Sequence, residues 1–255
     1  DGESSLPRKE EGCMAKENGT WIIRGLKLED PACLKTPEEL ACYIRQVGFL
    51  PLFANSIPGF SVEEHTASRF WWSGVTEHDP WEWRRILPAQ GELAYGKFFG
   101  GKAGYISREW FPVFANYRRN GYDFDSLYED ELANYRSKKI MDLFPGEEEL
   151  FSFEVRRKAG FEKGGEKNFE GVMTALQMQT YLIARDLRQR KNAKGQPYGW
   201  AVTVYSTPEH LYGYDWVTSA YGEEPSRSRQ RILEQLYRQF PDADEALARE
   251  AGVIR

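Results

Sequence analysis

The segment from 168 to 206 constrains the fold more than any other part of the chain, because it reads as a helix followed directly by two strands. Its helical half carries one apolar stripe at spacings of three and four residues, formed by Phe169, Val172, Met173 and Leu176. This stripe predicts that the helix docks on a core, with Glu170, Thr174 and Gln177 facing outwards.

Two segments rich in β-branched and aromatic residues follow, TYLIARDLRQ and WAVTVYS, separated by the turn-forming RKNAKGQPYG. A helix continued by such a hairpin predicts a winged-helix module, in which the hairpin is the wing. The wing carries one acid, Asp186, and five cations: Arg185, Arg188, Arg190, Lys191 and Lys194. Such charge suits a phosphate backbone, although lysines and arginines on a hairpin are commonly a solvated edge that discourages strand pairing. We predict that these five residues and Thr174 contact DNA.

Two more helices are expected upstream, over 130–144 and 146–161, joined to the helix at 169 by a flexible GFEKGGEKN connection. Three helices before a hairpin is the order that a winged-helix module requires. The apolar residues expected to form the docking surface of the two upstream helices are Leu132, Tyr135, Ile140, Leu143, Phe144, Leu150, Phe151, Phe153 and Val155.

The first half of the chain contains a sharply bounded helix. Thr36 is its predicted N-cap, Pro37 fits the first turn, Glu39 completes a capping box, and Gly48 ends the helix. Its expected buried stripe consists of Leu40, Tyr43, Ile44 and Val47. The following segment, 49–74, has prolines and glycines without a sustained period, which predicts an irregular, well-packed connection.

A second helix is predicted from Asp79 to Pro88, followed by a hairpin with a Gly-Gly turn and a third helix that Ser107 caps and Gly121 ends. The order helix, hairpin, helix recurs over 168–209 and predicts a diverged internal duplication. Chance recurrence of short elements is the alternative.

These patterns together predict an α+β fold of tandem winged-helix-like modules. We expect a disordered N-terminus over 1–20, modules over 21–122 and 123–222, and a helical tail over 223–255. Met14 is a candidate for the biological start. The tail should bury one helix face, formed by Ile232, Leu233, Leu236 and Tyr237.

Composition limits the classes of function. A net charge of −5 argues against a chain that coats nucleic acid indiscriminately, but it is compatible with a local basic face. No apolar run approaches the roughly 18 residues of a membrane span, and no secretory signal is present, so we expect a cytoplasmic protein. Three cysteines without CxxC spacing indicate neither a disulfide framework nor a zinc site. No metal or cofactor is expected, and no feature indicates an oligomeric state.

For two further clusters of residues we favour a structural role over a functional one. The aromatic residues Phe70, Trp71, Trp72, Trp81 and Trp83 could stack on bases or on a sugar, but core packing explains most of them. An acid–base or metal site could be assembled from Glu63, Glu64, His65, His78 and Asp79, but their spacing in a loop fixes no geometry.

Gln177 and Gln179 form a pair whose meaning depends on secondary structure. On a continuing helix, residues two apart point in nearly opposite directions, whereas in an extended segment they share a face. Because the apolar stripe ends at Leu176 and TYLI is strand-like, we expect the transition here, with both amides converging on a water or a base edge. The alternative is one surface glutamine and one partly buried glutamine at a helix end.

The ALQMQ segment before a strand, the basic wing, and the Tyr198-Gly199-Trp200 sequence resemble the AlkZ-related proteins, a group similar to the winged-helix DNA glycosylases of the AlkZ and YcaQ kind. The resemblance implies tandem winged helices and a Gln-x-Gln or Gln-x-Asp motif that excises N-alkylated purines and unhooks interstrand crosslinks without metal. By that motif, Gln177 and Gln179 are the catalytic pair, and the partner is duplex DNA carrying alkylated bases.

This chemistry is physically reasonable, because a cationic N7-alkylated base needs little activation as a leaving group and stacks weakly. A different class remains open: a noncatalytic winged-helix regulator that reads base edges with Glu170, Thr174 and Gln177. A protein-interaction module without a nucleic-acid role is the third possibility.

Overall fold

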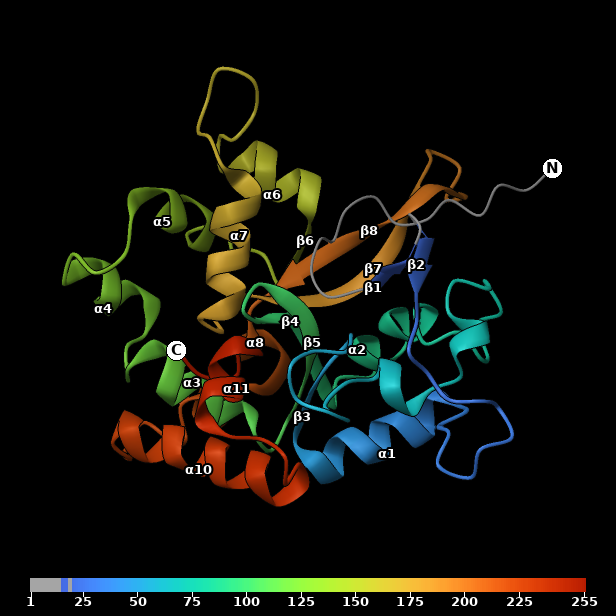
Figure 1. Cartoon of the computed structure of the whole chain (residues 1–255). Helices are drawn as coiled ribbons and strands as arrows, with labels where there is room; N and C mark the ends of the chain where they lie inside the picture. The colour runs from blue at the N-terminus through green and yellow to red at the C-terminus, as the bar shows by residue number, and fades with distance from the viewer. Residues whose placement is uncertain (1–14, 18–19) are drawn as a thin grey trace.

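The computed structural model describes residues 15–17 and 20–255 (Figure 1). Within this part of the chain, helices alternate with small antiparallel sheets, which confirms the predicted α+β class. The predicted start at Met14 lies outside the described residues, as does most of the segment predicted to be disordered. In that segment, however, Ala15–Glu17 (β1) pairs with Thr20–Ile22 (β2), so disorder was the wrong prediction for these residues.

Helix α1, Pro37–Val47, begins and ends as its caps predict. The Thr36 hydroxyl accepts a hydrogen bond from the Glu39 backbone N–H at 3.2 Å, and Gly48 ends the helix with φ 97°. The Glu39 carboxylate accepts from the backbone N–H of Lys35, one residue before the expected partner. The stripe residues Leu40, Ile44 and Val47 are buried, and Tyr43 is half-buried.

The first sheet consists of Phe49–Pro51 (β3), Leu93–Phe99 (β4) and Lys102–Ser107 (β5), in the order β3-β5-β4. Gly100 and Gly101 form the predicted turn of the hairpin, and both have positive φ, as a tight two-residue turn requires.

The connection between β3 and β4 contains short helices. Three are 3-10 helices, Glu63–His65 (η1), Ser68–Phe70 (η2) and Glu82–Arg85 (η3), and the fourth is α2, Leu87–Gln90. The predicted end of a helix at Pro88 is wrong. Pro88 lies in the first turn of α2, where its missing N–H breaks no helical hydrogen bond.

The second sheet consists of Glu149–Phe151 (β6), Ile183–Lys191 (β7) and Pro197–Ser206 (β8), in the order β6-β8-β7. The helices around it are Phe124–Glu129 (α4), Tyr135–Met141 (α5), Ser152–Lys158 (α6) and Phe169–Met178 (α7). The two long helices predicted over 130–144 and 146–161 are therefore wrong in extent. Glu131 has φ 60° and separates α4 from α5, while Leu150 is in a strand opposite Tyr205.

This difference changes which side chains are buried. Leu132, Tyr135 and Phe153, which were expected in the docking surface, are exposed. The GFEKGGEKN connection, which was predicted to be flexible, is held by ion pairs, because the Glu166 carboxylate pairs with Arg136 and Lys139 at 3.2 Å each.

The two sheets repeat one topology. In each repeat a helix (α1 or α5) precedes a short strand (β3 or β6), a further helix (α2 or α7) precedes the hairpin, and the short strand pairs with the second hairpin strand. The predicted repeat is thus present, with an additional strand that the sequence pattern missed. One continuous buried core spans both repeats, so the module boundaries stay a prediction.

The repeats pack on each other reciprocally. Helix α7 of the second repeat packs against β4 of the first, while η3 and α2 of the first pack against β7 of the second. Strands β4 and β7 also contact each other (Figure 1). The helix that precedes each hairpin is therefore in contact with the hairpin of the other repeat.

The remaining helices are Phe111–Arg119 (α3), Pro208–Tyr212 (α8), Tyr214–Val217 (α9), Pro225–Gln239 (α10) and Glu245–Glu250 (α11). The prediction that Ser107 caps α3 is wrong, because Ser107 ends β5 and is buried, and Trp110 is at the cap. Helix α10 packs against α3 and buries Ile232, Leu233 and Leu236 as predicted.

Candidate nucleic-acid interface

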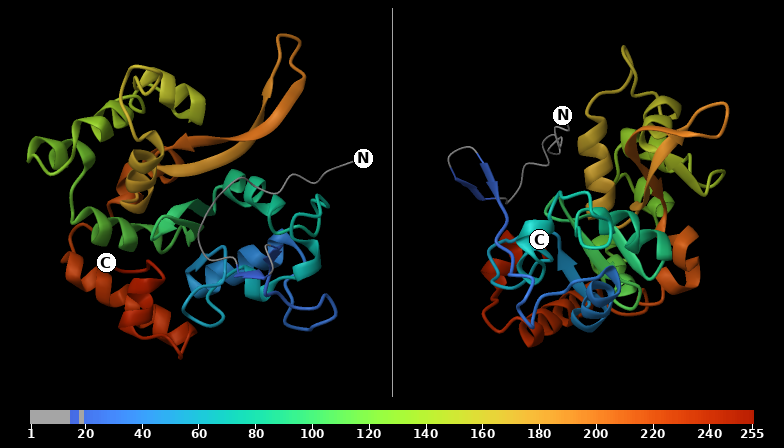
Figure 2. Two further views of the ribbon diagram at one scale, coloured as in Figure 1. Left: turned by 45° about the horizontal axis from the view of Figure 1, so that its top comes forward. Right: turned by 90° about the vertical axis from the view of Figure 1, so that its right-hand side faces the viewer.

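The predicted wing is the hairpin of β7 and β8, which extends beyond the body of the molecule (Figure 2). Residues 183–188 are buried or half-buried at its base, and every residue from 189 to 200 is exposed. We call these two parts the inner wing and the outer wing. The five predicted cationic contacts are divided between them.

The inner wing uses its cations within the protein. Arg185 donates to the backbone carbonyl of Pro88 at 2.5 Å. Arg188 pairs with Asp186 at 2.6 Å and with Glu149 of β6 at 2.5 Å, and the Glu149 hydrogen bond is the main cause that raises the pKa of Arg188. Within the sequence of the hairpin, Asp186 is the only acid. Glu149 was missed because it is 39 positions away from Arg188 in the chain.

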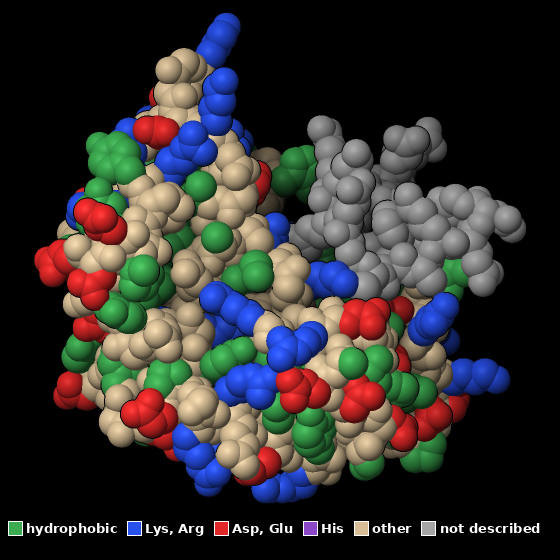
Figure 3. All heavy atoms as spheres, turned by 60° about the vertical axis from the view of Figure 1, so that its left-hand side comes forward, with side chains coloured by type: hydrophobic (Ala, Val, Ile, Leu, Met, Phe, Trp, Pro, Cys, Tyr) green, Lys and Arg blue, Asp and Glu red, His purple; other side chains and the backbone are tan. Residues whose placement is uncertain are grey.

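The outer wing keeps its positive charge. Lys191 and Lys194 are exposed and form no ion pair with any residue that the structure describes. The Arg190 guanidinium lies 5.2 Å from the Tyr198 ring centroid and 5.5 Å from that of Phe153. No acid occurs between Gln189 and Trp200 in the sequence. Lys and Arg side chains also gather near the middle of the face in Figure 3, where acidic side chains are scattered.

Gln177 is buried, with 2% of its surface exposed, so the prediction that it faces outwards is wrong. Its Oε1 accepts from the backbone N–H of Lys97 at 3.1 Å, and its Nε2 donates to the Met173 carbonyl at 3.0 Å. Lys97 falls in a register shift of β4 between Gly96 and Phe99, where the strand ladder is interrupted. The Gln177 side chain therefore accepts a hydrogen bond from a backbone N–H in the β4 bulge, which belongs to the other repeat.

Gln179 follows the last helical residue of α7 and keeps helical dihedrals, φ −81° and ψ −1°. The backbone changes course one residue later, at Thr180, whose φ is 67°. The predicted transition to strand at Leu176 is thus wrong, and the two glutamines leave a helical backbone in different directions. The Gln179 side chain is half-buried and makes no hydrogen bond with the described part of the chain.

Thr174, the remaining predicted DNA contact, faces the first hairpin. A Cβ placed on Gly101 in the β4–β5 turn would lie 3.3 Å from Cγ2 of Thr174. Contact with the opposite repeat therefore occupies part of the surface of α7 that was expected to face a ligand.

The loop acids have structural partners. Glu63 accepts from the backbone N–H groups of Arg24 and Ala54 at 2.6 and 2.7 Å, and burial raises its pKa while these hydrogen bonds oppose the rise. Asp79 accepts from the backbone N–H groups of Trp72, Gly74 and Trp81. In the ranges that the structure describes, no group of His, Cys, Asp and Glu could hold a metal ion.

Core packing accounts for part of the aromatic cluster, since Trp71 and Trp83 are buried and Phe70, Trp72 and Trp81 are half-buried. The most exposed large hydrophobic residue that the structure describes is Trp200 in the outer wing, at 77%. Our sequence interpretation did not single out Trp200 as a contact. Its signal is Gly199, because a glycine inside a strand often marks a bulge.

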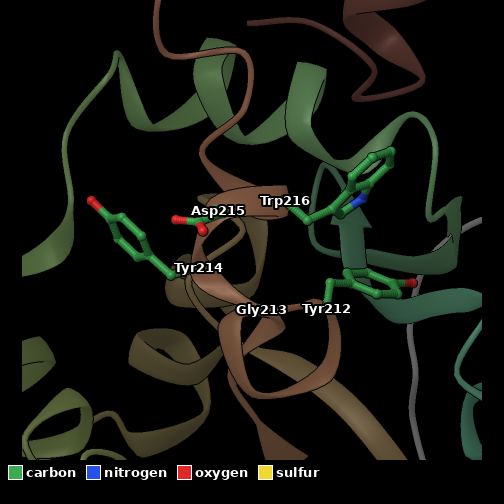
Figure 4. A pocket seen from close by; sticks show the side chains of 5 residues that line it. All are labelled: Tyr212, Gly213, Tyr214, Asp215 and Trp216. Carbon is green, nitrogen blue, oxygen red and sulfur yellow. The ribbon is translucent and has the colours of Figure 1, made fainter.

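An open pocket of about 540 Å³ is lined by residues 212–216 (Figure 4). Tyr212 and Trp216 point to one side and Tyr214 to the other. Trp216 donates to the Arg108 carbonyl at 2.9 Å, and Tyr214 donates to the Asp123 carboxylate at 2.6 Å. Because these side chains diverge, the pocket offers no convergent set of polar groups to one ligand.

A second pocket, of about 340 Å³, lies between α4 and α8 beside the start of β7. Its buried cation, Arg119, pairs with Glu209 at 2.6 Å and also bonds Thr180. The one arginine that lines this pocket in the described structure is therefore neutralised by Glu209, and Asp123 and Asp125 leave the lining with an excess of acids.

A family model described as AlkZ related matches residues 34–251. The chain therefore belongs to the AlkZ related family, which confirms the predicted resemblance. No curated protein and no solved structure matches the chain. In the described ranges, no helix is long and apolar enough to cross a membrane.

Proposed function

We propose that this protein binds duplex DNA and excises N-alkylated purines, as a glycosylase of the winged-helix type. The observation that carries the DNA-binding part is the outer wing, where Lys191 and Lys194 have no acidic partner in the described structure. The whole chain has a net charge of −5, so a polyanion would be attracted to a local basic surface such as this one and not to the protein as a whole.

The packing of α7 favours repair over sequence reading. A noncatalytic regulator would address base edges with Glu170, Thr174 and Gln177, and only Glu170 of these three is exposed. Gln177 is buried on Lys97, and Thr174 lies beside Gly101. A surface that holds DNA mainly through phosphates can accept many sequences and select for distortion or weak stacking.

The chemistry that we propose assigns different tasks to the two glutamines. Gln179, with its amide unbonded within the described chain, positions the attacking water, and Gln177 holds the end of α7 on β4. Cleavage breaks the bond between C1′ of the sugar and N9 of the alkylated purine, and the bonding electrons neutralise the cationic base as it leaves. The oxygen of the water bonds to C1′, and the water releases one proton to solvent. An amide suffices because this leaving group needs no general acid. No metal takes part in the proposed reaction.

Removing the outer-wing charges should weaken DNA binding. The double variant Lys191→Ala plus Lys194→Ala is expected to bind a random duplex roughly tenfold more weakly at low salt, with a salt slope smaller by about 2, because each lysine releases counterions from a phosphate. Fluorescence anisotropy over a salt series measures both quantities.

The matched control is Lys138→Ala plus Lys158→Ala, which removes the same charge from lysines already paired with Asp142 and Glu147. An equal loss of affinity in both double variants would show that total charge, and not the wing, governs binding.

Selection from a random DNA library is expected to yield no consensus site. Phosphate contacts carry no sequence information, and α7 has too little free surface to supply it. A sharp consensus would support the regulator instead, whereas preference for alkylated duplexes regardless of sequence supports repair.

A further inference from the structure

Trp200 is exposed to a degree that packing does not explain. Its exposed fraction of 77% exceeds that of every other large hydrophobic residue in the described structure, of which Leu132 is next at 61%. Surface tryptophans usually bury one ring face, because the indole is the largest apolar side chain.

A bulge of β8 places this side chain. The strand register runs from Gln189 opposite Ala201 to Arg190 opposite Tyr198, so Gly199 and Trp200 have no partner in β7. Gly199 has φ 71°, a conformation that glycine adopts without strain, and its carbonyl accepts from Nε2 of Gln189 at 2.7 Å. Bulges commonly re-aim a side chain, and this one is fixed by its own hydrogen bond.

Neighbouring aromatic rings have partners, whereas Trp200 does not. The Arg190 guanidinium lies against Tyr198 and Phe153, and the Phe153 ring stacks on Phe151 with centroids 5.3 Å apart. Among the described residues, no ring, cation or hydrogen-bond acceptor contacts the Trp200 indole. An indole held away from the core is available to a planar partner.

The geometry points to Trp200 as a stacking residue for a base exposed at a distortion in duplex DNA. This inference rests on the proposed function and deepens it. The surrounding charge selects the occupant, since the outer wing has Arg190, Lys191 and Lys194 and no acid. Phosphates attract these cations while a base face attracts the ring, and stacking on an aromatic side chain tolerates any base. An alkylated base stacks weakly and exposes such a face.

The test compares two duplexes of one sequence, one intact and one containing a single-nucleotide gap that exposes a base. Trp200→Ala is expected to bind the gapped duplex about tenfold more weakly than wild type does, and the intact duplex within about twofold, because only the gap offers a base to stack on. Trp200→Phe, which keeps an aromatic ring, should bind the gapped duplex nearly as tightly as wild type does. The matched control, Trp216→Ala, removes an indole that is bonded to Arg108 and should change neither affinity.

Each outcome decides one proposal. If wild type binds neither duplex, the proposed function fails and the role of Trp200 fails with it. If wild type binds both duplexes and Trp200→Ala binds each of them as tightly as wild type does, DNA binding stands and the stacking role is overturned. If Trp200→Ala leaves DNA binding intact but lowers the molar mass measured by light scattering, the indole docks a second copy, which also overturns the stacking role.

Discussion

Replacing Arg118 by alanine is expected to lower the free energy of unfolding by about 3–5 kcal/mol. The side chain is buried and donates four hydrogen bonds to backbone carbonyls. One terminal nitrogen donates to Phe98 at 2.5 Å and Met178 at 2.8 Å, and the other donates to Gly252 and Val253 at 3.1 Å each. Arg118 thus joins β4, the end of α7 and the C-terminal segment.

The size of the effect follows from what the variant leaves behind. Four carbonyls lose a charged donor, and refilling the site with water is limited because the residue is 6% exposed. Burial lowers the pKa of Arg118 to about 9, which leaves the guanidinium charged at neutral pH. Arg118→Lys should rescue little, since a single ammonium cannot reproduce the fork of a guanidinium.

Urea denaturation followed by circular dichroism measures this loss. The control is Arg156→Ala, which removes an exposed arginine paired with Glu170 and should cost at most about 1 kcal/mol. Similar losses in the two variants would contradict the assignment of Arg118 as the link between the repeats.

Local signals predicted the elements whose causes are local. The caps of α1, the Gly100-Gly101 turn and the stripe of α7 each depend on residues within a few positions, and all three are present. Strand β6 was missed because Leu150 becomes a strand only by pairing with Tyr205. Leu132 was misplaced for a different, local reason: the positive φ of Glu131, which is rare for a residue other than glycine, interrupts the expected helix.

The candidate site shows the same division. A basic hairpin can be read from its own residues, but Arg188 is neutralised partly by Glu149 from another strand. The burial of Gln177 depends on a bulge at Lys97, 80 positions earlier. Periodicity within one helix cannot reveal a partner that a different repeat supplies.

The glutamines lead to the prediction with the largest functional effect. In single-turnover excision of an N7-alkylated purine, Gln179→Ala is expected to lower the rate about 100-fold, because the water would lose the group that we propose positions it. Affinity for the duplex should remain near that of wild type, since we propose that phosphate contacts in the outer wing supply it. Unfolding free energy should also remain unchanged, because the Gln179 amide has no partner in the described chain.

Gln177→Ala should behave differently, and the contrast separates positioning from catalysis. Its Oε1 satisfies the Lys97 N–H inside the protein, so the variant should lose about 1–3 kcal/mol of unfolding free energy together with excision rate. A rate loss in Gln177→Ala without destabilisation would place Gln177 in the reaction itself. Excision by Gln179→Ala at the wild-type rate would remove Gln179 from the mechanism. If wild type releases no base from any of several alkylated duplexes but still binds them with a salt slope, the enzymatic half of the proposal fails while DNA binding stands, since the outer wing acts without the glutamines.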